Sequence, residues 1–366
     1  MTSLSVLILS PNPRVHGGVS TFIELMKRHL KQSSASALWV GSVPGEKEGV
    51  ISQLRRMVTV PFVAAWRVRI EKPDAVHINP SLDWKSVVRD CLILLALRVA
   101  GYRNILVYFH GWEPGVEHKI ENNYFLKKLF VWLLNCTAKV VVLSPEFKDA
   151  LLRMGVVKQK VATSRTMFDG AAVKKASGQE MPLRRTVLFM SRFVRAKGIF
   201  ELLEGFASVA AEFPDVDLIL AGDGPDAAPL KQRASDLHLN TRVQFPGYVV
   251  GDAKFAMLAQ CTIYALPTYY PEGMPVALLE AMGAGKPLLT AKTGVIPYII
   301  SQPENGIVLD QVTTQHVAEA LRQLLSNPKN CLEVGERNRA YAWKEFEAEQ
   351  VTAHIEKIYA GIKEAA

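Results

Sequence analysis

The sequence predicts an α/β protein of two domains, each built on a doubly wound parallel sheet. Short apolar runs that are typical of strands alternate with helical segments along nearly the whole chain, as in parallel sheets covered by helices. One polar, aperiodic stretch over 171–184 interrupts the alternation and is typical of a linker. The length of 366 residues suffices for two domains that each bury a core.

The pattern also predicts the order of the elements. In the first half we expect strands at 4–9, 37–40, 75–78, 104–109 and 139–143, and helices at 18–30, 84–100, 124–136 and 146–153. In the second half we expect strands at 186–190, 216–221, 242–245, 262–266 and 287–290, and helices at 199–211, 227–237 and 253–259. The predicted domains are 1–172 and 173–345, followed by a C-terminal segment, 346–366.

The charge of the chain is unevenly divided. Residues 1–172 carry 23 Lys and Arg against 13 Asp and Glu, whereas residues 173–366 carry 20 against 22. The first half should therefore face an anionic partner. The four cysteines lie far apart without metal-ligand spacing, and the N-terminus lacks the basic region of a signal peptide. We expect reduced thiols, no metal site and a cytoplasmic protein.

The most informative stretch follows the predicted strand 262–266. It reads Pro271-Glu272-Gly273-Met274-Pro275-Val276, and the helix that it opens carries Glu280. A helix start presents free N–H groups and positive potential to an anion, so we expect donors at Gly273, Met274 and Val276, while Pro275 has none. Eight residues separate Glu272 from Glu280, which would place both carboxylates near one side of a helix. An acidic first turn with a solvated Glu is the alternative interpretation.

Three further loops follow predicted strands. Gly17 and Gly18 open the first helix and allow a close approach of a ligand. His110 follows the strand 104–109, at the edge where open α/β sheets bind ligands. Arg192 and Lys197 lie in one loop and suit a diphosphate. Each pattern alone also fits a plain turn, a structural His or an ordinary basic loop.

The string Pro-Glu272-Gly-Met-Pro-x4-Glu280-Ala-Met-Gly-Ala-Gly-x-Pro closely resembles the nucleotide-sugar signature of retaining GT-B glycosyltransferases with the E-x7-E motif, the group 1 glycosyl transferases of glycosyltransferase family 4. The resemblance covers nearly the whole chain, strongly over 186–310 and weakly before. It implies two Rossmann-like domains facing a cleft. It also implies a last helix that crosses back to the first domain.

The resemblance implies roles for individual residues. Glu272 would contact the donor sugar, Glu280 the ribose, and the amides that follow Glu272 the sugar and phosphate. Arg192 and Lys197 match an Arg-x4-Lys-Gly motif that binds the leaving diphosphate. The remaining implied donor contacts are His110 near the anomeric centre, Gly17 and Gly18 near the phosphates, and the loop Gly247-Tyr248-Val249 at the base.

Two other stretches fit the motifs of glycosyltransferases poorly. Asp215-Val-Asp217 spells the D-x-D of metal-dependent transferases, but it follows a proline and opens a buried strand, so a turn and strand start is the better interpretation. Where similar proteins often carry an Asn-Gly-hydrophobic-Asp loop, this chain has Ser164-Arg-Thr-Met-Phe-Asp169. This departure leaves the contribution of that loop without a prediction.

The resulting prediction is a retaining, metal-independent hexosyltransferase without a cofactor, which takes a UDP-sugar or GDP-sugar as co-substrate. Its acceptor would be a lipid-linked glycan in bacterial surface-polysaccharide synthesis, and no nucleic-acid partner is expected. Basic and aromatic residues over 54–69 and 124–134 predict contact with the inner face of the cytoplasmic membrane. Core helices flanked by solvated charges would give the same pattern. The alternatives are a sugar-nucleotide 2-epimerase, a transferase to a soluble acceptor, and a sugar-nucleotide binding module without activity.

Overall fold

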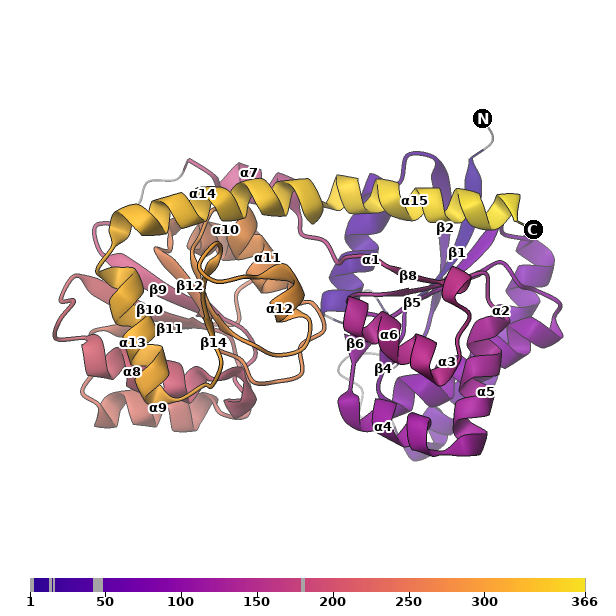
Figure 1. Cartoon of the computed structure of the whole chain (residues 1–366), viewed down its shortest axis with the longest axis horizontal. Helices are drawn as coiled ribbons and strands as arrows, with labels where there is room; N and C mark the ends of the chain where they lie inside the picture. Colours follow the sequence, from indigo (N-terminus) through magenta and orange to yellow (C-terminus); the bar gives the residue numbers. More distant parts are fainter. Residues whose placement is uncertain (1–2, 13–14, 16, 42–48, 179–181, 366) are drawn as a thin grey trace. The chain divides into compact units, whose positions relative to one another are not determined.

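The computed structural model describes residues 3–12, 15, 17–41, 49–178 and 182–365. The chain forms two compact units (Figure 1). Unit 1 comprises Met1–Met167 together with Ala348–Ala366, and unit 2 comprises Phe168–Glu347. The predicted boundary at 172/173 falls inside a short helix, α7 (Gly170–Ala176), which packs on other helices of unit 2. The predicted linker 171–184 is therefore helical in its first part, and its residues 179–181 lie outside the described residues.

Unit 1 is a six-stranded parallel sheet in the order β2-β1-β3-β5-β7-β8. Its strands are β1 (Leu4–Ser10), β2 (Ser33–Trp39), β3 (Ala75–Ile78), β5 (Ile105–Tyr108), β7 (Lys139–Val142) and β8 (Val161–Thr163), with the short pair β4 (Ser81–Leu82) and β6 (Gly111–Trp112) beside them. Its helices are α1 (Gly18–His29), α2 (Val50–Glu71), α3 (Trp84–Val99), α4 (Pro114–Asn122), α5 (Tyr124–Asn135), α6 (Pro145–Met154), the 3-10 turn η1 (Lys158–Lys160) and α15 (Ala348–Glu364).

The central strands of unit 1 are buried on both faces, as continuous apolar runs in a parallel sheet require. Helix α15 packs on α1 and β3, and α3 packs on α2 and α5. In Figure 1, α1 and α15 lie on one side of this sheet and α2, α3 and α5 on the other. The last helix of the chain thus completes the core of the first unit.

Unit 2 repeats this architecture with a parallel sheet in the order β11-β10-β9-β12-β13-β14. Its strands are β9 (Arg185–Met190), β10 (Val216–Ala221), β11 (Val243–Gly247), β12 (Ile263–Leu266), β13 (Leu288–Ala291) and β14 (Gly306–Leu309). Besides α7, its helices are η2 (Arg195–Lys197), α8 (Ile199–Val209), α9 (Ala227–Asp236), α10 (Gly251–Gln260), α11 (Val276–Gly283), α12 (Ile296–Ile299), α13 (Thr314–Leu325) and α14 (Pro328–Glu345).

The predicted α/β fold class is confirmed, and the sequence pattern located most of the strands and helices. It missed α2, whose apolar residues run round the helix and include Pro61, so that no single face gives a periodic signal. It also missed the twelve-residue helix α13 and the short elements α4, α7, α12, β8 and β14. Both sheets place the carboxyl ends of their central strands beside the loops that carry the candidate residues, which is where open α/β sheets bind ligands.

Candidate active site

Two loops of unit 2 pack tightly at the carboxyl ends of β9 and β12. Gly198 has a φ of +70°, and a Cβ there would lie 1.9 Å from the carbonyl oxygen of Pro267. The backbone N–H groups of Tyr269 and Tyr270 both donate to the carbonyl of Ala196 at 2.9 Å. Glycine is therefore required at position 198 for both its conformation and its small size. This contact brings the basic loop after β9 against the acidic loop after β12.

Lys197 and Glu272 meet where these loops touch. The Lys197 Nζ lies 2.5 Å from Glu272 Oε1, which also accepts a hydrogen bond of 3.0 Å from the Thr268 hydroxyl. Both side chains are largely buried, and the Lys197 ammonium lies 4.6 Å from the centre of the Tyr270 ring. Because a buried ion pair is costly to desolvate, the enclosing loops must hold it in place. The structure thus brings two of the predicted site residues into direct contact.

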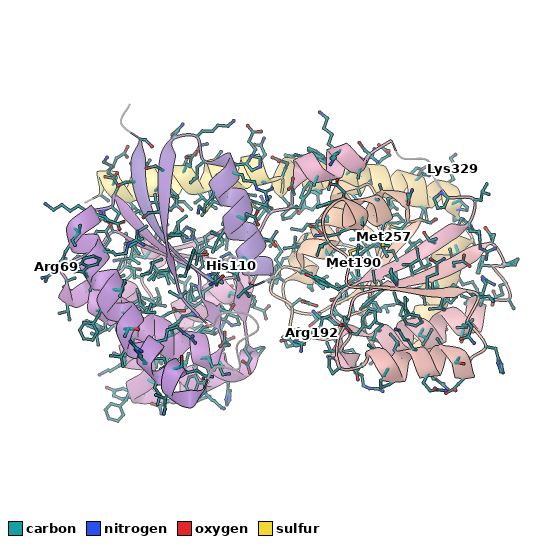
Figure 2. All side chains as sticks on the ribbon, turned by 180° about the vertical axis from the view of Figure 1, so that it is seen from behind. Arg69, His110, Met190, Arg192, Met257 and Lys329 are labelled. Carbon is teal, nitrogen blue, oxygen red and sulfur yellow. The ribbon has the colours of Figure 1, made fainter. Side chains whose placement is uncertain are left out.

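Arg192 lies in the same loop as Lys197, just beyond Met190 at the end of β9 (Figure 2). Its side chain is exposed and forms no ion pair with another residue of the described chain. Arg195, between them, is used differently, because its guanidinium stacks 4.1 Å from the Phe200 ring. Arg192 is therefore the cation of this loop that is available to an anionic ligand.

Helix α11 starts later than predicted. It begins at Val276 with Pro275 as its N-cap residue, so Gly273 and Met274 lie in the preceding loop. Glu272 is therefore not on the helix, and the expectation that Glu272 and Glu280 share a helical face is wrong. The prolines on either side of Gly273 hold the chain extended and delay the first helical turn. Gly294 supports the loop instead, since a Cβ there would lie 1.9 Å from the carbonyl oxygen of Glu272.

Glu280 is buried on α11 with only one of its oxygens paired. Oε1 lies 2.5 Å from the Nζ of Lys254 on α10, whereas Oε2 is buried without a hydrogen-bond partner in the described chain. Burial raises the pKa of this carboxyl, although the nearby Lys254 opposes the shift. A buried acceptor without a donor is costly. Glu280 Oε2 is therefore available to accept a hydrogen bond from a hydroxyl or N–H group of a ligand.

The segment 247–249 begins at the last residue of β11, at the edge of the same sheet. Gly247 has a φ of +79°, and its carbonyl accepts a hydrogen bond of 2.7 Å from the N–H of Gly222, at the end of β10. No atom lies within 4 Å of a Cβ built at Gly247, and the Tyr248 side chain is exposed. Gly247, Tyr248 and Val249 thus form an open edge beyond the β10 and β11 strand ends.

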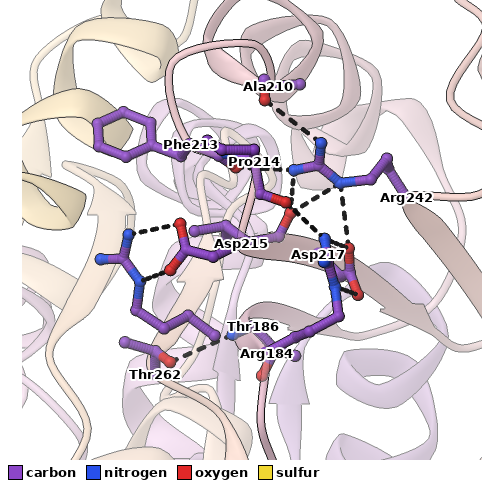
Figure 3. Close-up of polar contacts among 11 residues, drawn as sticks. Arg184, Thr186, Ala210, Phe213, Pro214, Asp215, Asp217, Arg242 and Thr262 are labelled. Atoms are coloured by element: carbon purple, nitrogen blue, oxygen red, sulfur yellow. Dashed lines mark hydrogen bonds and ion pairs between the residues drawn. The ribbon is translucent and has the colours of Figure 1, made fainter.

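Asp215 and Asp217 are held by arginines (Figure 3). Asp215, in the turn before β10, pairs with Arg185 at 2.6 Å. Asp217, within β10, pairs with Arg184 at 2.7 Å and with Arg242 at 3.1 Å. The interpretation as a turn and strand start is confirmed. These guanidinium groups keep the pKa values of both carboxyls below their usual range.

In unit 1, His110 lies just after β5, in an aromatic pocket. Its ring stacks on Tyr108 with centroids 5.0 Å apart and meets the edge of Phe22 from α1 at 4.5 Å. Its Nε2 lies 2.9 Å from Oδ1 of Asn79, whose Nδ2 donates to the carbonyl of Leu9. That donation turns Oδ1 toward His110, so Nε2 carries the proton and donates. Burial lowers the pKa of His110 to about 3, which keeps the ring neutral with Nδ1 as an acceptor.

The predicted pair of glycines starts α1 in unit 1. Gly17 is the N-cap residue and Gly18 the first helical residue, and both are exposed. Phe22, one turn further along α1, contacts His110. The structure therefore brings the start of α1 and His110 to the same edge of the unit 1 sheet.

Sequence reasoning missed the partners of the predicted residues. Lys254 pairs with Glu280, Thr268 with Glu272, and Asn79 with His110. Lys254 lies on a different helix from Glu280, and Asn79 follows a different strand from His110, so no local spacing could have indicated these contacts. Thr268 is in the same loop as Glu272 and could have been noticed as a neighbouring donor.

The described residues contain neither a metal-binding cluster nor a membrane-spanning helix. Within the described ranges, no group of three or more His, Cys, Asp or Glu side chains is placed to hold a metal ion. None of the described helices is both long and apolar enough to cross a membrane.

The chain is similar in sequence to known glycosyltransferases. Residues 174–341 match the family of glycosyl transferases group 1. The chain is 26% identical to the GDP-mannose-dependent alpha-(1-6)-phosphatidylinositol monomannoside mannosyltransferase of Mycolicibacterium smegmatis, over 98% of this chain and 99% of that protein. It is 30% identical to the N-acetyl-alpha-D-glucosaminyl L-malate synthase of Bacillus anthracis, over 48% of this chain and 45% of that protein.

Solved structures share the fold over the whole chain. The Anabaena HepE structure in complex with UDP and glucose superposes with a TM-score of 0.73 at 18% identity, covering 98% of this chain and 99% of that one. The sucrose-phosphate synthase of Thermosynechococcus elongatus gives a TM-score of 0.77 at 18% identity, covering 99% and 100%. With its two parallel-sheet units, the chain has the two-domain α/β GT-B fold, and its residues 174–341 match the glycosyl transferases group 1 family of glycosyltransferases.

Proposed function

We propose that the enzyme transfers a sugar from a nucleoside diphosphate, UDP or GDP, to an acceptor hydroxyl with retention at the anomeric carbon. The contact of Lys197 with Glu272, beside the unpaired Arg192, carries this proposal. Two cations at the carboxyl edge of a sheet suit the diphosphate, and the adjacent carboxylate suits sugar hydroxyls. The name of the mannosyltransferase relative specifies GDP-mannose, and the HepE structure contains UDP.

Glu280 is assigned to the ribose of the donor. Its buried Oε2 needs a donor, and a ribose hydroxyl supplies one without adding charge. Gly273, Met274, Pro275 and Val276 would line the sugar and phosphate, with amide donors at all but the proline. The edge Gly247-Tyr248-Val249 would receive the base.

The chemistry needs charge stabilisation more than a nucleophile. The bond from the anomeric carbon to the phosphate oxygen breaks, and the bond to the acceptor oxygen forms on the same face of the sugar. The acceptor proton passes to the leaving phosphate, so we assign no protein general base. Arg192 and Lys197 stabilise the departing diphosphate. We propose that this reaction uses neither a metal ion nor a cofactor.

We further propose that the acceptor is a lipid-linked glycan of bacterial surface-polysaccharide synthesis, met on the cytoplasmic side of the membrane. The positive charge of residues 1–172 and the phosphatidylinositol named in one relative support a lipid acceptor. L-malate, named in the other relative, represents the competing class of soluble acceptors.

The proposal is tested by screening UDP-sugars and GDP-sugars for protection against thermal unfolding, since a ligand at 100 times its dissociation constant adds roughly 2.7 kcal/mol of stability. Glu280→Gln should weaken the binding of the stabilising nucleotide sugar by about tenfold or more, because an NH2 group replaces one of the two acceptor oxygens of the carboxylate. Glu204→Gln, on α8 and paired with Arg233 and Thr314, is the control and should bind normally.

The stereochemical part is tested by NMR of the product. Retention of the donor configuration supports the proposal, and inversion contradicts it. Release of a nucleotide sugar epimerised at C2, with no transfer to any acceptor, would identify the 2-epimerase instead. Failure of every nucleotide sugar to stabilise the protein would remove the donor assignment altogether.

A further inference from the structure

Three neighbouring helices of unit 1 expose apolar side chains on the surface away from the sheet. Helix α2 buries a stripe of small residues, Val60, Ala64 and Val68, at intervals of four. Its other side is also apolar, and carries a second stripe with the same spacing: Leu54, Val58, Phe62, Trp66 and Ile70. Phe62 is 71% exposed and Trp66 is 63% exposed. A helix of a soluble domain normally turns charged residues outward at such positions.

Helices α3 and α5 continue this surface. The exposed stripe of α3 comprises Trp84, Val88, Leu92, Leu95 and Val99, and that of α5 comprises Phe125, Leu129 and Trp132. Val99 is 76% exposed and Phe125 is 82% exposed. Because α3 packs against both α2 and α5, the three helices that carry these stripes are neighbours (Figure 1), and side chains of the α2 and α3 stripes line one groove. Single exposed apolar residues are ordinary, whereas aligned stripes on three adjacent helices indicate a binding surface. We call it the α2–α3–α5 face.

A groove of about 600 Å³ runs between α2 and α3 within this face. Ala65 and Ala96 lie in it, and the larger side chains that line it include Phe62, Trp66 and Leu95. Arg69 is the one charged residue among those that line the groove, and it lies at the surface of unit 1 (Figure 2). The size and apolar lining suit an aliphatic chain better than a polar metabolite.

The surplus of positive charge on the three helices indicates an anionic partner. The three helices contain nine Lys and Arg and only two Asp and Glu. Both acids are already paired within their own helices, Glu71 with Arg67 at 2.5 Å and Asp90 with Arg89 at 2.7 Å. The face therefore combines exposed Trp, Phe and Leu with a surplus of cations, the composition of helices that lie in the interface of an anionic bilayer.

We propose that the α2–α3–α5 face lies on an anionic phospholipid bilayer and that the α2–α3 groove takes one acyl chain from it. This inference rests on the proposed function in one respect: the face would be the surface at which the enzyme meets a lipid-linked acceptor. Membrane binding itself needs neither the donor nor the acceptor. The two proposals can therefore fail separately.

The first experiment measures co-sedimentation with vesicles of phosphatidylglycerol and of phosphatidylcholine. Wild type should bind the anionic vesicles at low salt and release them at high salt. Phe62→Ser/Trp66→Ser should weaken binding by about tenfold or more, because exposed aromatic area is lost. Lys127→Glu/Lys128→Glu should also weaken it by about tenfold. Phe62, Trp66 and Lys128 are exposed and Lys127 is half-buried, so the variants should remain folded.

Matched controls lie in unit 2. Leu332→Ser removes an exposed apolar side chain, and Lys329→Glu reverses an exposed charge, both on α14. Both controls should bind vesicles like wild type, as should Arg192→Ala, which impairs the proposed transfer. Equal loss in the controls and the face variants would overturn the assignment of the face, as would absence of binding by wild type.

The second experiment tests the groove with a short-chain phosphatidylglycerol kept below its micelle concentration. Wild type should gain about 2 °C or more in unfolding temperature, and glycerol phosphate, which lacks the chains, should give no shift. Ala96→Trp fills the groove without removing apolar surface and should abolish the shift, and Ala65→Trp provides an independent test. A shift that persists in both variants would overturn the acyl-chain site.

Self-association is the competing use of the face. Sedimentation velocity of the wild type and of Phe62→Ser/Trp66→Ser decides between them. A monomer at all concentrations agrees with the membrane assignment. A concentration-dependent dimer that the double substitution abolishes would replace the membrane with a second copy of the chain.

Discussion

At the level of single residues, the three cations of the basic loop after β9 should differ in their contribution to the reaction. Arg192→Ala and Lys197→Ala should each lower kcat by about 100-fold or more, since a lost charge-stabilising donor typically costs about 2.7–4 kcal/mol of transition-state energy. Arg195→Ala removes a cation that stacks on Phe200 and should change kcat by less than threefold. Steady-state rates of nucleoside diphosphate release measure all three. Activity near that of wild type in either of the first two variants would remove that residue from the mechanism.

The buried histidines of unit 1 give a prediction about pH. Burial lowers the pKa values of His77 and His110 to about 3, well below the ordinary value of 6.5. Their NMR signals should therefore stay unchanged between pH 8 and pH 5, whereas exposed histidines titrate. The unfolded chain takes up these protons below about pH 6.5, so the stabilisation is complete above that pH and is lost as the pH falls toward 3. A titration of either ring near pH 6.5 would contradict the burial described.

Much of the site could be predicted from residues at strand ends. Lys197, Glu272 and His110 follow β9, β12 and β5, and the predicted strands placed them at the same edges as the structure does. The partners that fix them could not be predicted, because Asn79 and Lys254 come from other strands or helices and their contacts depend on the tertiary fold. The contact of Lys197 with Glu272 likewise depends on how closely two loops approach.

At the level of elements, the approach of those loops depends on Gly198. Gly198→Ala should lower the stability of unit 2 by about 2 kcal/mol or more, because its Cβ would overlap the Pro267 carbonyl and its φ is positive. Gly251→Ala is the matched control. Its φ of +60° is similar but its Cβ would meet open space, so a loss of only about 1 kcal/mol is expected. Chemical denaturation monitors both, and equal losses would show that steric overlap at Gly198 is unimportant.

The start of α11 shows the limit of reading elements from sequence. Glu272 and Glu280 have a helical spacing, yet Pro275 and the loop before it delay the helix to Val276. Helix α2 shows the opposite problem, because its length is obvious in the structure but its apolar residues face in all directions. In both places the physical cause is local. Pro275 delays the start of α11, and the lack of a polar face on α2 hides the helical period in the sequence.

At the level of the whole molecule, the arginine network of β10 bears on the proposed metal independence. Asp215 and Asp217 are committed to Arg185, Arg184 and Arg242. Turnover should therefore be unchanged in EDTA. Asp215→Asn should lower the free energy of unfolding and leave kcat close to that of wild type. Loss of activity in EDTA that Mg²⁺ or Mn²⁺ restores would contradict the proposal. The measurement is kcat at saturating donor and acceptor, with and without chelator.

Unit 1 is built from two parts of the chain. Tyr359 of α15 is fully buried and its hydroxyl lies 2.6 Å from Nδ1 of His77, while Glu356 accepts hydrogen bonds from the backbone N–H groups of Lys31 and Gln32. A chain ending at Glu347 should therefore leave the 1–167 segment sensitive to protease while 168–347 resists. Tyr359→Phe should cost about 1–3 kcal/mol, since the buried His77 ring loses its partner. Equal protease resistance of both segments would contradict the role given to α15.

The same arrangement sets an order of events during synthesis. Unit 2 is one continuous stretch and can close as soon as it leaves the ribosome. Unit 1 begins to emerge first but waits for Ala348–Glu364 to cover its sheet, roughly ten to forty seconds later at about 5–20 residues per second. During that interval its apolar strands and α1 are open to chaperones or to aggregation. The unit that is translated first is therefore the last to finish folding.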